Sequence, residues 1–483
     1  MDIKSKLEIL EKKARQLEVL DDRRNHWLTA VTDYGHRALD AMSTRKAYED
    51  YDLETMTNYT FDIEDEPTAV ETVIEEVEEW IDKPGLNAAS GGHLGYIPGG
   101  GLFPTALGDF MAAINNNYAG IFYGGPGAVR LENSLSRWLC DLIGYPKTAM
   151  GNLASGGSIA TLTAIVTARD YKGINSTNVR KSVIYLTEQA HHCVQKAIRI
   201  GGLGEAQLRY IPLMDDYRMD VAALRKAVAE DKANGLNPFL VLAAAGATDT
   251  GIVDPLDEIA DVAEEFDLWY HIDGAYGGFF ILVDELKPLF KGIERSDSFV
   301  ADPHKGLFLS YGLGMVVIKN TEAMYKSHQY KPSEANYMQD ATDFVEEYSP
   351  ADLSPELTKH FRGLRMYMPL KLYGLNTFKA ALEEKVYLTR YFHDKITELG
   401  FETGGYPMLS VMMYRYTPKG YSLEQANDLN KKLVEIVKTD GRVFISSTRL
   451  DGVFWLRMAI LSFRTHKHHM DITLELLKQG ITI

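Results

Sequence analysis

Cysteine is almost absent from this sequence, which has only Cys140 and Cys193 among its 483 residues. Two cysteines so far apart exclude a disulfide framework and give no zinc-ligand spacing, so no metal is expected. No apolar run approaches the ~18 residues of a membrane-spanning helix, and we expect no membrane association. The chain is charged from Asp2 onward, which argues against a signal peptide. We therefore expect a cytoplasmic protein.

Basic clusters, internal repeats and low-complexity tracts are also lacking. The net charge is −16, and no run rich in lysine or arginine offsets it, so binding to nucleic acids is disfavoured. The composition, 45% hydrophobic and 24% charged, is that of an ordinary globular protein. Because one hydrophobic core stops growing at ~250–300 residues, we expect two or three domains.

Apolar runs that alternate with helical stretches occupy the middle of the chain. The candidate strands are residues 182–186, 239–245, 268–272, 298–301 and 315–318. This alternation predicts an α/β fold with a mainly parallel sheet covered by helices. We expect a helical N-terminal segment over 1–102, a large domain over 103–370 and a small C-terminal α/β domain over 371–483.

Two further segments carry expectations of their own. Residues 319–355 are polar and lack a clear period, which predicts a long functional loop. Residues 363–393 predict one long helix.

Ionisable residues follow two of the candidate strands directly. Asp273 comes after strand 268–272, and Asp302, His304 and Lys305 come after strand 298–301. Open α/β sheets bind ligands at the carboxyl ends of their strands, where these side chains would meet. A lysine that can form a Schiff base and a carboxylate that can hold a pyridine nitrogen protonated are what pyridoxal phosphate (PLP) requires.

Two segments near these strands have side chains suited to the same cofactor. Residues 151–158 are rich in glycine and serine and run into a helical stretch, which suits a phosphate, although a plain helix cap is the alternative. His191 follows strand 182–186, where an imidazole can stack on a flat ring, or can be an ordinary loop histidine.

Two hydroxyl-bearing residues are further candidates. Thr248 follows strand 239–245 and can bond a cofactor or substrate oxygen, or can cap its own turn. Tyr337 lies in the long polar segment, where a phenol can donate a proton, although an exposed loop tyrosine is usually neutral to function.

Ordered motifs between residues 90 and 465 resemble those of the group II PLP-dependent decarboxylases, the family of aromatic-L-amino-acid, histidine and glutamate decarboxylases. The motifs are Tyr96-Ile-Pro98 with Phe103-Pro104, Ser155-Gly-Gly-Ser158, Gln189-Ala-His191, His271-Ile-Asp273-Gly-Ala275-Tyr276-Gly, Asp302-Pro-His304-Lys305, Phe361-Arg-Gly-Leu-Arg365 and Leu456-Arg457-Met-Ala-Ile460. The resemblance implies the aspartate-aminotransferase-like fold type I, with a mainly parallel seven-stranded sheet. It also implies a homodimer whose subunits share active sites, and an amino acid as the small-molecule substrate.

The resemblance assigns roles to single residues. Lys305 would bind PLP covalently, Asp273 would pair with the pyridine nitrogen, and Ala275 and His191 would lie on opposite faces of the ring. Gly157, Ser158 and His304 would hold the phosphate with Asp302 close by, and Thr248 would lie near the cofactor or substrate. Tyr337 would be the proton donor. The residues that would line the substrate pocket are Tyr96, Ile97, Pro98, Phe103 and Arg457.

The expected reaction is decarboxylation of an L-amino acid with an aromatic or apolar side chain to the amine and CO2, within amino-acid metabolism. The sequence departs from the animal aromatic enzymes at Gly306, where they have tryptophan, and at Gly274, where alanine is usual. Gly99-Gly100-Gly101 and Lys305-Gly306-Leu307 are instead similar to a bacterial branch of the family. The alternatives are a carbon–carbon lyase, an aldehyde-forming decarboxylase, a transaminase and a catalytically silent binding protein of the same fold.

Overall fold

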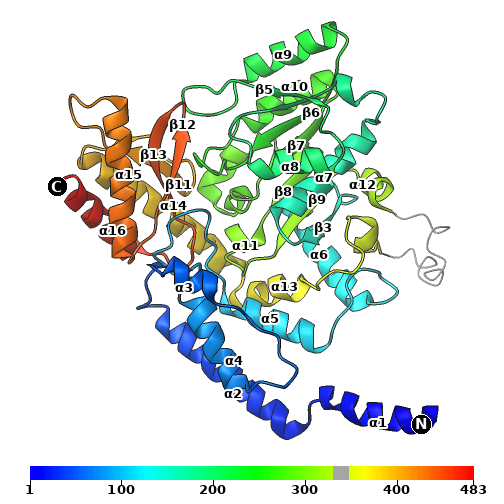
Figure 1. Cartoon of the computed structure of the whole chain (residues 1–483). Coiled ribbons are helices and arrows are strands. Elements are labelled where there is room, and N and C mark those ends of the chain that lie inside the picture. The colour runs from blue at the N-terminus through cyan, green and yellow to red at the C-terminus, as the bar shows by residue number, and fades with distance from the viewer. Residues whose placement is uncertain (330–346, 483) are drawn as a thin grey trace.

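The computed structural model describes residues 1–329 and 347–482. Figure 1 shows a central α/β domain, with N-terminal helices below it and a smaller α/β domain at one side. Among the described residues, no helix has both the length and the apolar character needed to cross a membrane.

The central sheet has seven strands in the order β3-β9-β8-β7-β6-β4-β5, and only β9 runs antiparallel to its neighbours. The strands are β3 (Met150–Ala154), β4 (Ser182–Leu186), β5 (Gln207–Tyr210), β6 (Asn237–Ala244), β7 (Trp269–Asp273), β8 (Ser298–Ala301) and β9 (Gly314–Ile318). Most are buried along their whole length, because helices cover both faces of a parallel sheet. The predicted mainly parallel seven-stranded sheet is confirmed.

Each face of the sheet packs against its own set of helices. One core joins the sheet to α6 (Pro126–Leu142), α9 (Val221–Ala233) and α10 (Leu256–Phe266). The other joins it to α7 (Gly157–Tyr171), α8 (His192–Ile200) and α12 (Thr321–His328). Helix α12 lies inside the segment that was predicted to be one long irregular loop, so that prediction was wrong at its start.

The small domain has a four-stranded antiparallel sheet in the order β10-β11-β13-β12. Its elements are α14 (Leu375–Glu398), β10 (Glu402–Thr403), β11 (Val411–Arg415), α15 (Leu423–Asp440), β12 (Ser446–Leu450), β13 (Val453–Ala459) and α16 (Lys467–Gly480). The single helix predicted over 363–393 is instead two helices, α13 (Gly363–Tyr373) and α14. They part at Gly374, whose φ of 69° is left-handed and ends α13.

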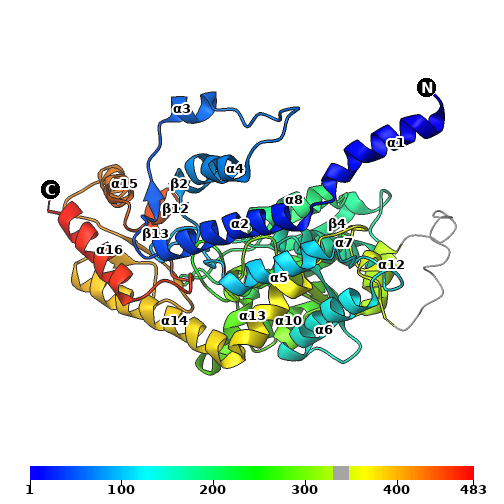
Figure 2. The ribbon, with the colours of Figure 1, turned by 90° about the horizontal axis from the view of Figure 1, so that it is seen from below.

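The N-terminal segment contains α1 (Ile3–Ala14), α2 (Asp21–Ala41), β1 (Tyr48–Glu49), α3 (Leu53–Asn58), α4 (Val70–Val77) and β2 (Gly85–Leu86), and α5 (Phe103–Ile114) follows it. Helix α1 extends away from the rest of the molecule in both views (Figures 1 and 2), and it buries none of its residues. Residues 91–100 instead run along the small domain, where Leu94 bonds to Phe444 and Ala459 through its backbone. The domain boundaries at 102 and 370 stay predictions.

Candidate active site

A cavity of about 410 Å³ opens at the carboxyl ends of strands β3, β4, β6, β7 and β8. This is the edge where open α/β sheets place their ligands. All nine residues predicted to bind the cofactor line this cavity, and they are Gly157, Ser158, His191, Thr248, Asp273, Ala275, Asp302, His304 and Lys305. Residues far apart in the sequence therefore share one site.

Lys305 lies in α11 (Pro303–Gly306), directly after β8, and its amine donates to Asp302. Lys305 Nζ is 3.0 Å from Asp302 Oδ2. Burial acts to lower the pKa of the amine, but the charges of Asp302 and Asp273 and the hydrogen bond to Asp302 prevail, so the pKa lies above its ordinary value. The lysine is thus held as a cation in the free site.

Asp273 and His191 line the same cavity as the lysine but come from different elements. Asp273 ends β7, and its Oδ1 accepts a hydrogen bond of 3.0 Å from the backbone N–H of Ala275. His191 precedes α8, and its Nδ1 accepts from the backbone N–H of Cys193 at 3.3 Å. Burial lowers the pKa of His191, so its ring is neutral at neutral pH and is suited to stacking on a flat ligand.

The N-terminus of α7 forms another part of the cavity wall. This helix of 15 residues begins at Gly157, and its dipole favours an anion there. A Cβ on Gly157 would lie 2.9 Å from Asp302 Oδ2, so only glycine fits between the helix start and this carboxylate. His304 Nδ1 lies 2.5 Å from the carbonyl oxygen of Leu313 and must donate to it, while burial lowers the pKa of the ring.

These side chains fit PLP. The cavity offers an amine for covalent attachment, a carboxylate for the pyridine nitrogen, and a helix N-terminus with Ser158 for the phosphate. One buried oxygen, Asp302 Oδ1, has no hydrogen-bond partner within the described ranges. Within those ranges no group of three or more His, Cys, Asp or Glu residues is arranged to hold a metal ion.

The residues predicted to line the substrate pocket lie elsewhere. Tyr96, Ile97, Pro98 and Phe103 are not among the lining residues in the described part of this single chain. Tyr96 and Phe103 expose 60% and 48% of their surface, so both are accessible to another molecule.

Arg457 is buried and does not line the cavity either. It donates to the carbonyl oxygen of Thr248 through Nε at 2.8 Å and to that of Tyr96 through Nη1 at 2.9 Å. Nη1 also donates to Ser446 Oγ at 3.0 Å. The guanidinium therefore joins the small domain to the loop that carries Thr248.

Tyr337, the predicted proton donor, lies outside the described residues. The lining residues that had not been predicted include Cys193, Asp254 and Gly312. Asp254 accepts from the backbone N–H groups of Met219 and Ala244, each at 2.8 Å, and burial raises its pKa to about 6. An aspartate just before a proline and a helix reads as a turn, which is why its burial could not be seen from the sequence.

Comparison with known proteins gives consistent matches. Residues 53–404 match the pyridoxal-dependent decarboxylase conserved domain. An aromatic-L-amino-acid decarboxylase from Bacillus atrophaeus is 32% identical over 380 residues, which are 78% of each chain. A phenylacetaldehyde synthase from Petunia hybrida is 27% identical over 94% of this chain and 92% of its own. The crystal structure of Oryza sativa TDC with PLP and tryptamine has a similar fold, with a TM-score of 0.89 at 23% identity, over 96% of this chain and 98% of its own.

Proposed function

The chain belongs to the pyridoxal-dependent decarboxylase family, and we propose that its substrate is an aromatic L-amino acid, from which it releases CO2 and the amine. The predicted family, the PLP cofactor and the amino-acid decarboxylase activity are confirmed by this membership. The choice of an aromatic side chain is our inference, and a cytoplasmic location stays a prediction.

The absence of a second cation in the cavity lining carries the choice of substrate. Among the described residues, Lys305 is the only lysine or arginine there. An acidic side chain would lose its hydration in such a site without a partner charge, which costs several kcal/mol. Several lining residues, including Val194, Leu242 and Ala247, are apolar. The similar Bacillus enzyme, named for aromatic L-amino acids, gives independent support.

Each residue of the site has a part in this reaction. PLP, when bound, accepts the electron pair that the departing carboxylate leaves behind. Asp273 would keep a proton on the ring nitrogen, and the neutral His191 would hold the ring flat. Lys305 would give up its place to the substrate amine, and the N-terminus of α7 would hold the phosphate. A proton must then return to the substrate carbon, and we infer that Tyr337 supplies it.

The test is the release of amine and CO2 from each of the twenty amino acids, DOPA and 5-hydroxytryptophan. We expect product from aromatic substrates and none from glutamate or aspartate. The Lys305→Ala variant should release nothing and should retain no cofactor after borohydride reduction, whereas Lys319→Ala should behave as the unaltered protein. Release from acidic substrates alone would overturn the proposal.

Aldehyde formation is the second candidate, because a phenylacetaldehyde synthase is similar over 94% of this chain. This route releases ammonia and needs dissolved O2 as a two-electron oxidant, so measuring aldehyde beside amine in air-saturated buffer separates the two reactions. We expect amine as the main product. Tyr337→Phe removes the hydroxyl group, so protonation of the substrate carbon should slow and the product should shift towards aldehyde. Unchanged amine output from that variant would exclude Tyr337 as the donor.

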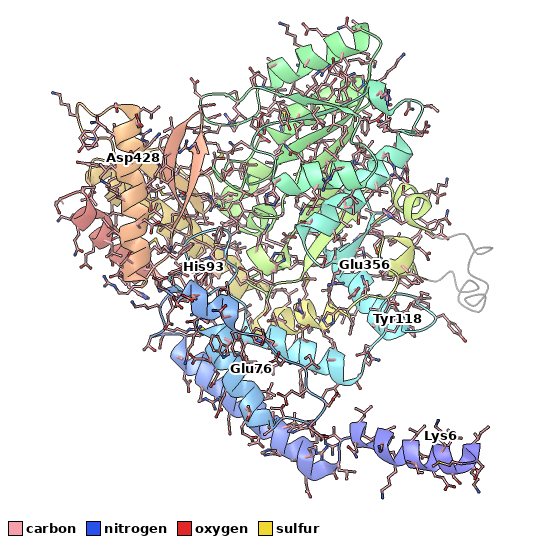
Figure 3. All side chains as sticks on the ribbon, in the orientation of Figure 1. Lys6, Glu76, His93, Tyr118, Glu356 and Asp428 are labelled. Carbon is pink, nitrogen blue, oxygen red and sulfur yellow. The ribbon has the colours of Figure 1, made fainter. Side chains whose placement is uncertain are left out.

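We further infer a homodimer. Helix α5 exposes Phe110, Met111 and Ile114, and α13, which packs against it, exposes Leu372 and Tyr373. Figure 2 shows both helices on one face of the molecule together with α2. Around Lys6, the side chains of α1 project into open space (Figure 3). Large apolar side chains exposed together on one face are typical of a protein–protein interface.

A further inference from the structure

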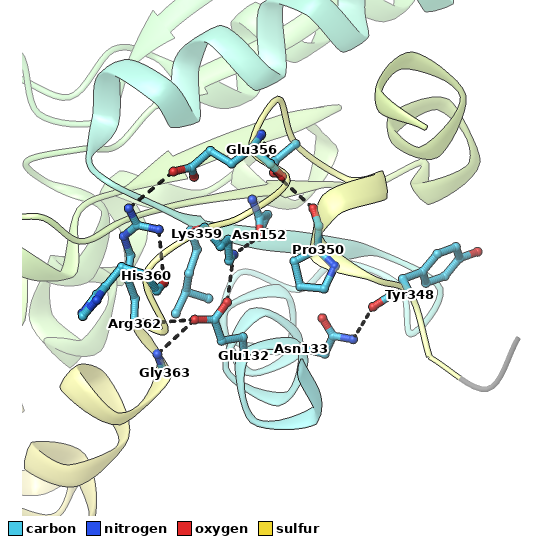
Figure 4. A network of polar contacts seen from close by, with 12 residues as sticks. Glu132, Asn133, Asn152, Tyr348, Pro350, Glu356, Lys359, His360, Arg362 and Gly363 are labelled. Carbon is cyan, nitrogen blue, oxygen red and sulfur yellow. Dashed lines mark hydrogen bonds and ion pairs between the residues drawn. The ribbon is translucent and has the colours of Figure 1, made fainter. Parts of the chain in front are cut away.

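A buried ion pair lies outside the cavity, between α6 and the segment that precedes α13 (Figure 4). Lys359 Nζ is 2.8 Å from Glu132 Oε2, and their side chains are 0% and 1% exposed. Burying such a pair is costly, and by itself it contributes little to stability. The hydrogen bonds of the two side chains show which segments of the chain the pair holds in place.

Lys359 holds β3, the strand that leads into the turn at residues 155–158 and the start of α7. Its amine also donates to Asn152 Oδ1 at 2.7 Å and to the carbonyl oxygen of Leu153 at 3.0 Å, and both residues belong to β3. The residues that follow this strand, Ser155 and Gly156, line the cavity and lead into α7. The cation thus fixes the chain two residues before the cavity wall begins.

Glu132 holds the other side of the same wall. Its Oε1 accepts from the backbone N–H groups of Arg362 and Gly363 at 2.8 and 3.1 Å, which caps the start of α13. The guanidinium of Arg362 in turn donates to the carbonyl oxygen of Gly312 at 3.3 Å. Gly312 lines the cavity, and the next residue, Leu313, accepts the hydrogen bond from His304.

We propose that Glu132 and Lys359 are positioning residues that set the phosphate end of the cofactor cavity. The pair links the turn at residues 155–158 to His304 through β3 and Arg362. Loss of the pair should therefore shift both the turn and His304. This inference rests on the proposed function, because PLP is the ligand whose phosphate occupies that end. Neither residue lines the cavity, so the pair acts on retention of the cofactor and not on the chemical step.

The test measures how tightly the full-length holoenzyme retains PLP, from the cofactor released on dilution. Lys359→Met should raise the dissociation constant by about tenfold or more, since a buried charged hydrogen bond is lost. At saturating PLP, kcat should stay near that of the unaltered protein. Asp141→Asn is the matched control, because Asp141 pairs with Lys147 at the exposed end of the same helix.

A double variant separates positioning from stability. Glu132→Gln combined with Lys359→Met leaves no unpaired buried charge, so its melting temperature should recover while its dissociation constant for PLP stays raised. Recovery of both would overturn the proposal. Asn152→Leu provides a milder variant in case the double variant does not fold. It removes one acceptor of Lys359 but keeps the ion pair, and unchanged retention of PLP would then contradict us.

The wild-type protein separates this inference from the function on which it rests. An unaltered protein that binds no PLP would refute the proposed function. A protein that binds PLP but releases no amine from aromatic substrates would refute the substrate alone, and the retention results would still decide the role of the pair.

Discussion

Gly306, the residue directly after Lys305, has no room for a side chain. A Cβ there would lie 2.9 Å from Phe279 Cβ and 3.0 Å from Phe279 Cδ2. Gly274 is confined in the same way, because its Cβ would meet the Phe299 ring at 2.4 Å. Both phenylalanines are fully buried and neither lines the cavity in the described chain. Phe279 and Phe299, which lie outside the cavity lining, therefore occupy the space beside Gly306 and Gly274. The glycines at these two positions do not widen the substrate site.

The Gly306→Ala substitution should accordingly destabilise the protein. We expect a loss of about 1–3 kcal/mol in the free energy of unfolding, because the added methyl group forces Phe279 or the backbone of α11 to move. Gly127→Ala is the control, since nothing lies within 4 Å of its added Cβ in α6. Denaturant unfolding of both variants provides the measurement. Equal stability of the two would show that Phe279 yields without cost.

His271 gives the stability of the protein a predictable pH dependence. It is 1% exposed, and its Nδ1 bonds Ser298 Oγ at 2.9 Å. Burial lowers its pKa to about 4 from 6.5. Between these two values the unfolded chain binds the extra proton, so this contribution to stability is complete above about pH 6.5 and is lost as the pH falls towards 4.

Replacing His271 with asparagine should therefore flatten the acid side of the stability curve. Between about pH 7.5 and 5.5, the unaltered protein should lose about 1 kcal/mol more free energy of unfolding than the variant does. Denaturant titrations at the two pH values give the comparison, and the slope matters even if the variant is less stable throughout. An equal loss of free energy of unfolding in both proteins would show that groups other than His271 cause the acid sensitivity.

Among the elements, β13 of the small domain controls a loop of the large one. Its Arg457 uses Nε, Nη1 and Nη2 to bind the carbonyl oxygens of Thr248 and Tyr96 and the hydroxyl of Ser446. Within the described chain the hydrogen bonds of this buried cation all go to neutral oxygens. An arginine so fully occupied by backbone is suited to hold the loop and not to bind a substrate carboxylate.

The Arg457→Lys variant distinguishes these two roles. A lysine cannot reproduce the forked contact, so the Thr248 loop should loosen. We expect the KM for the amino acid and the inhibition constant of the amine product to rise by a similar factor, about tenfold. Arg449→Lys is the control, because Arg449 is an exposed residue of the neighbouring strand β12. If the KM for the amino acid rose and the inhibition constant of the amine did not, Arg457 would be a direct contact of the substrate carboxylate.

The elements that could be predicted from the sequence are those with a pattern of their own. The five strands with apolar runs were found, because burial on both faces demands such runs. Strand β3 was missed since it contains Gly151 and Asn152, and the buried Asn152 finds its hydrogen-bond partner in the distant Lys359. Strand β5 was missed because it is a half-exposed edge strand with polar residues.

The same distinction applies to the site. Residues that follow strands at one edge of the sheet were predicted together, because strand direction alone brings them together. Asp254 and the Glu132–Lys359 pair could not be found, since their burial depends on chain segments that meet only in the folded protein. Tyr96 and Phe103 were predicted to line the substrate pocket, whereas both are exposed in the single chain.

At the scale of the whole molecule, the face formed by α5 and α13 should hold two chains together. Ile114 is 65% exposed on this face. A carboxylate there would be buried without a partner in a dimer, which opposes association. Light scattering should give twice 54.2 kDa for the unaltered protein and 54.2 kDa for Ile114→Glu. Leu423→Glu, at the exposed start of α15 in the small domain, should remain dimeric. A dimeric Ile114→Glu would place the interface elsewhere.

If the subunits share their active sites, two inactive variants should complement each other in a mixed dimer. If Tyr337 of one chain serves Lys305 of the other, Lys305→Ala and Tyr337→Phe damage different halves of each site. A mixed dimer then keeps one site in which both residues are intact. With random pairing of equal amounts, co-expression of the two variants should restore about one quarter of the unaltered amine output, although each variant alone yields little. Amine release no greater than the sum of the separate variants would mean that each subunit supplies its own tyrosine.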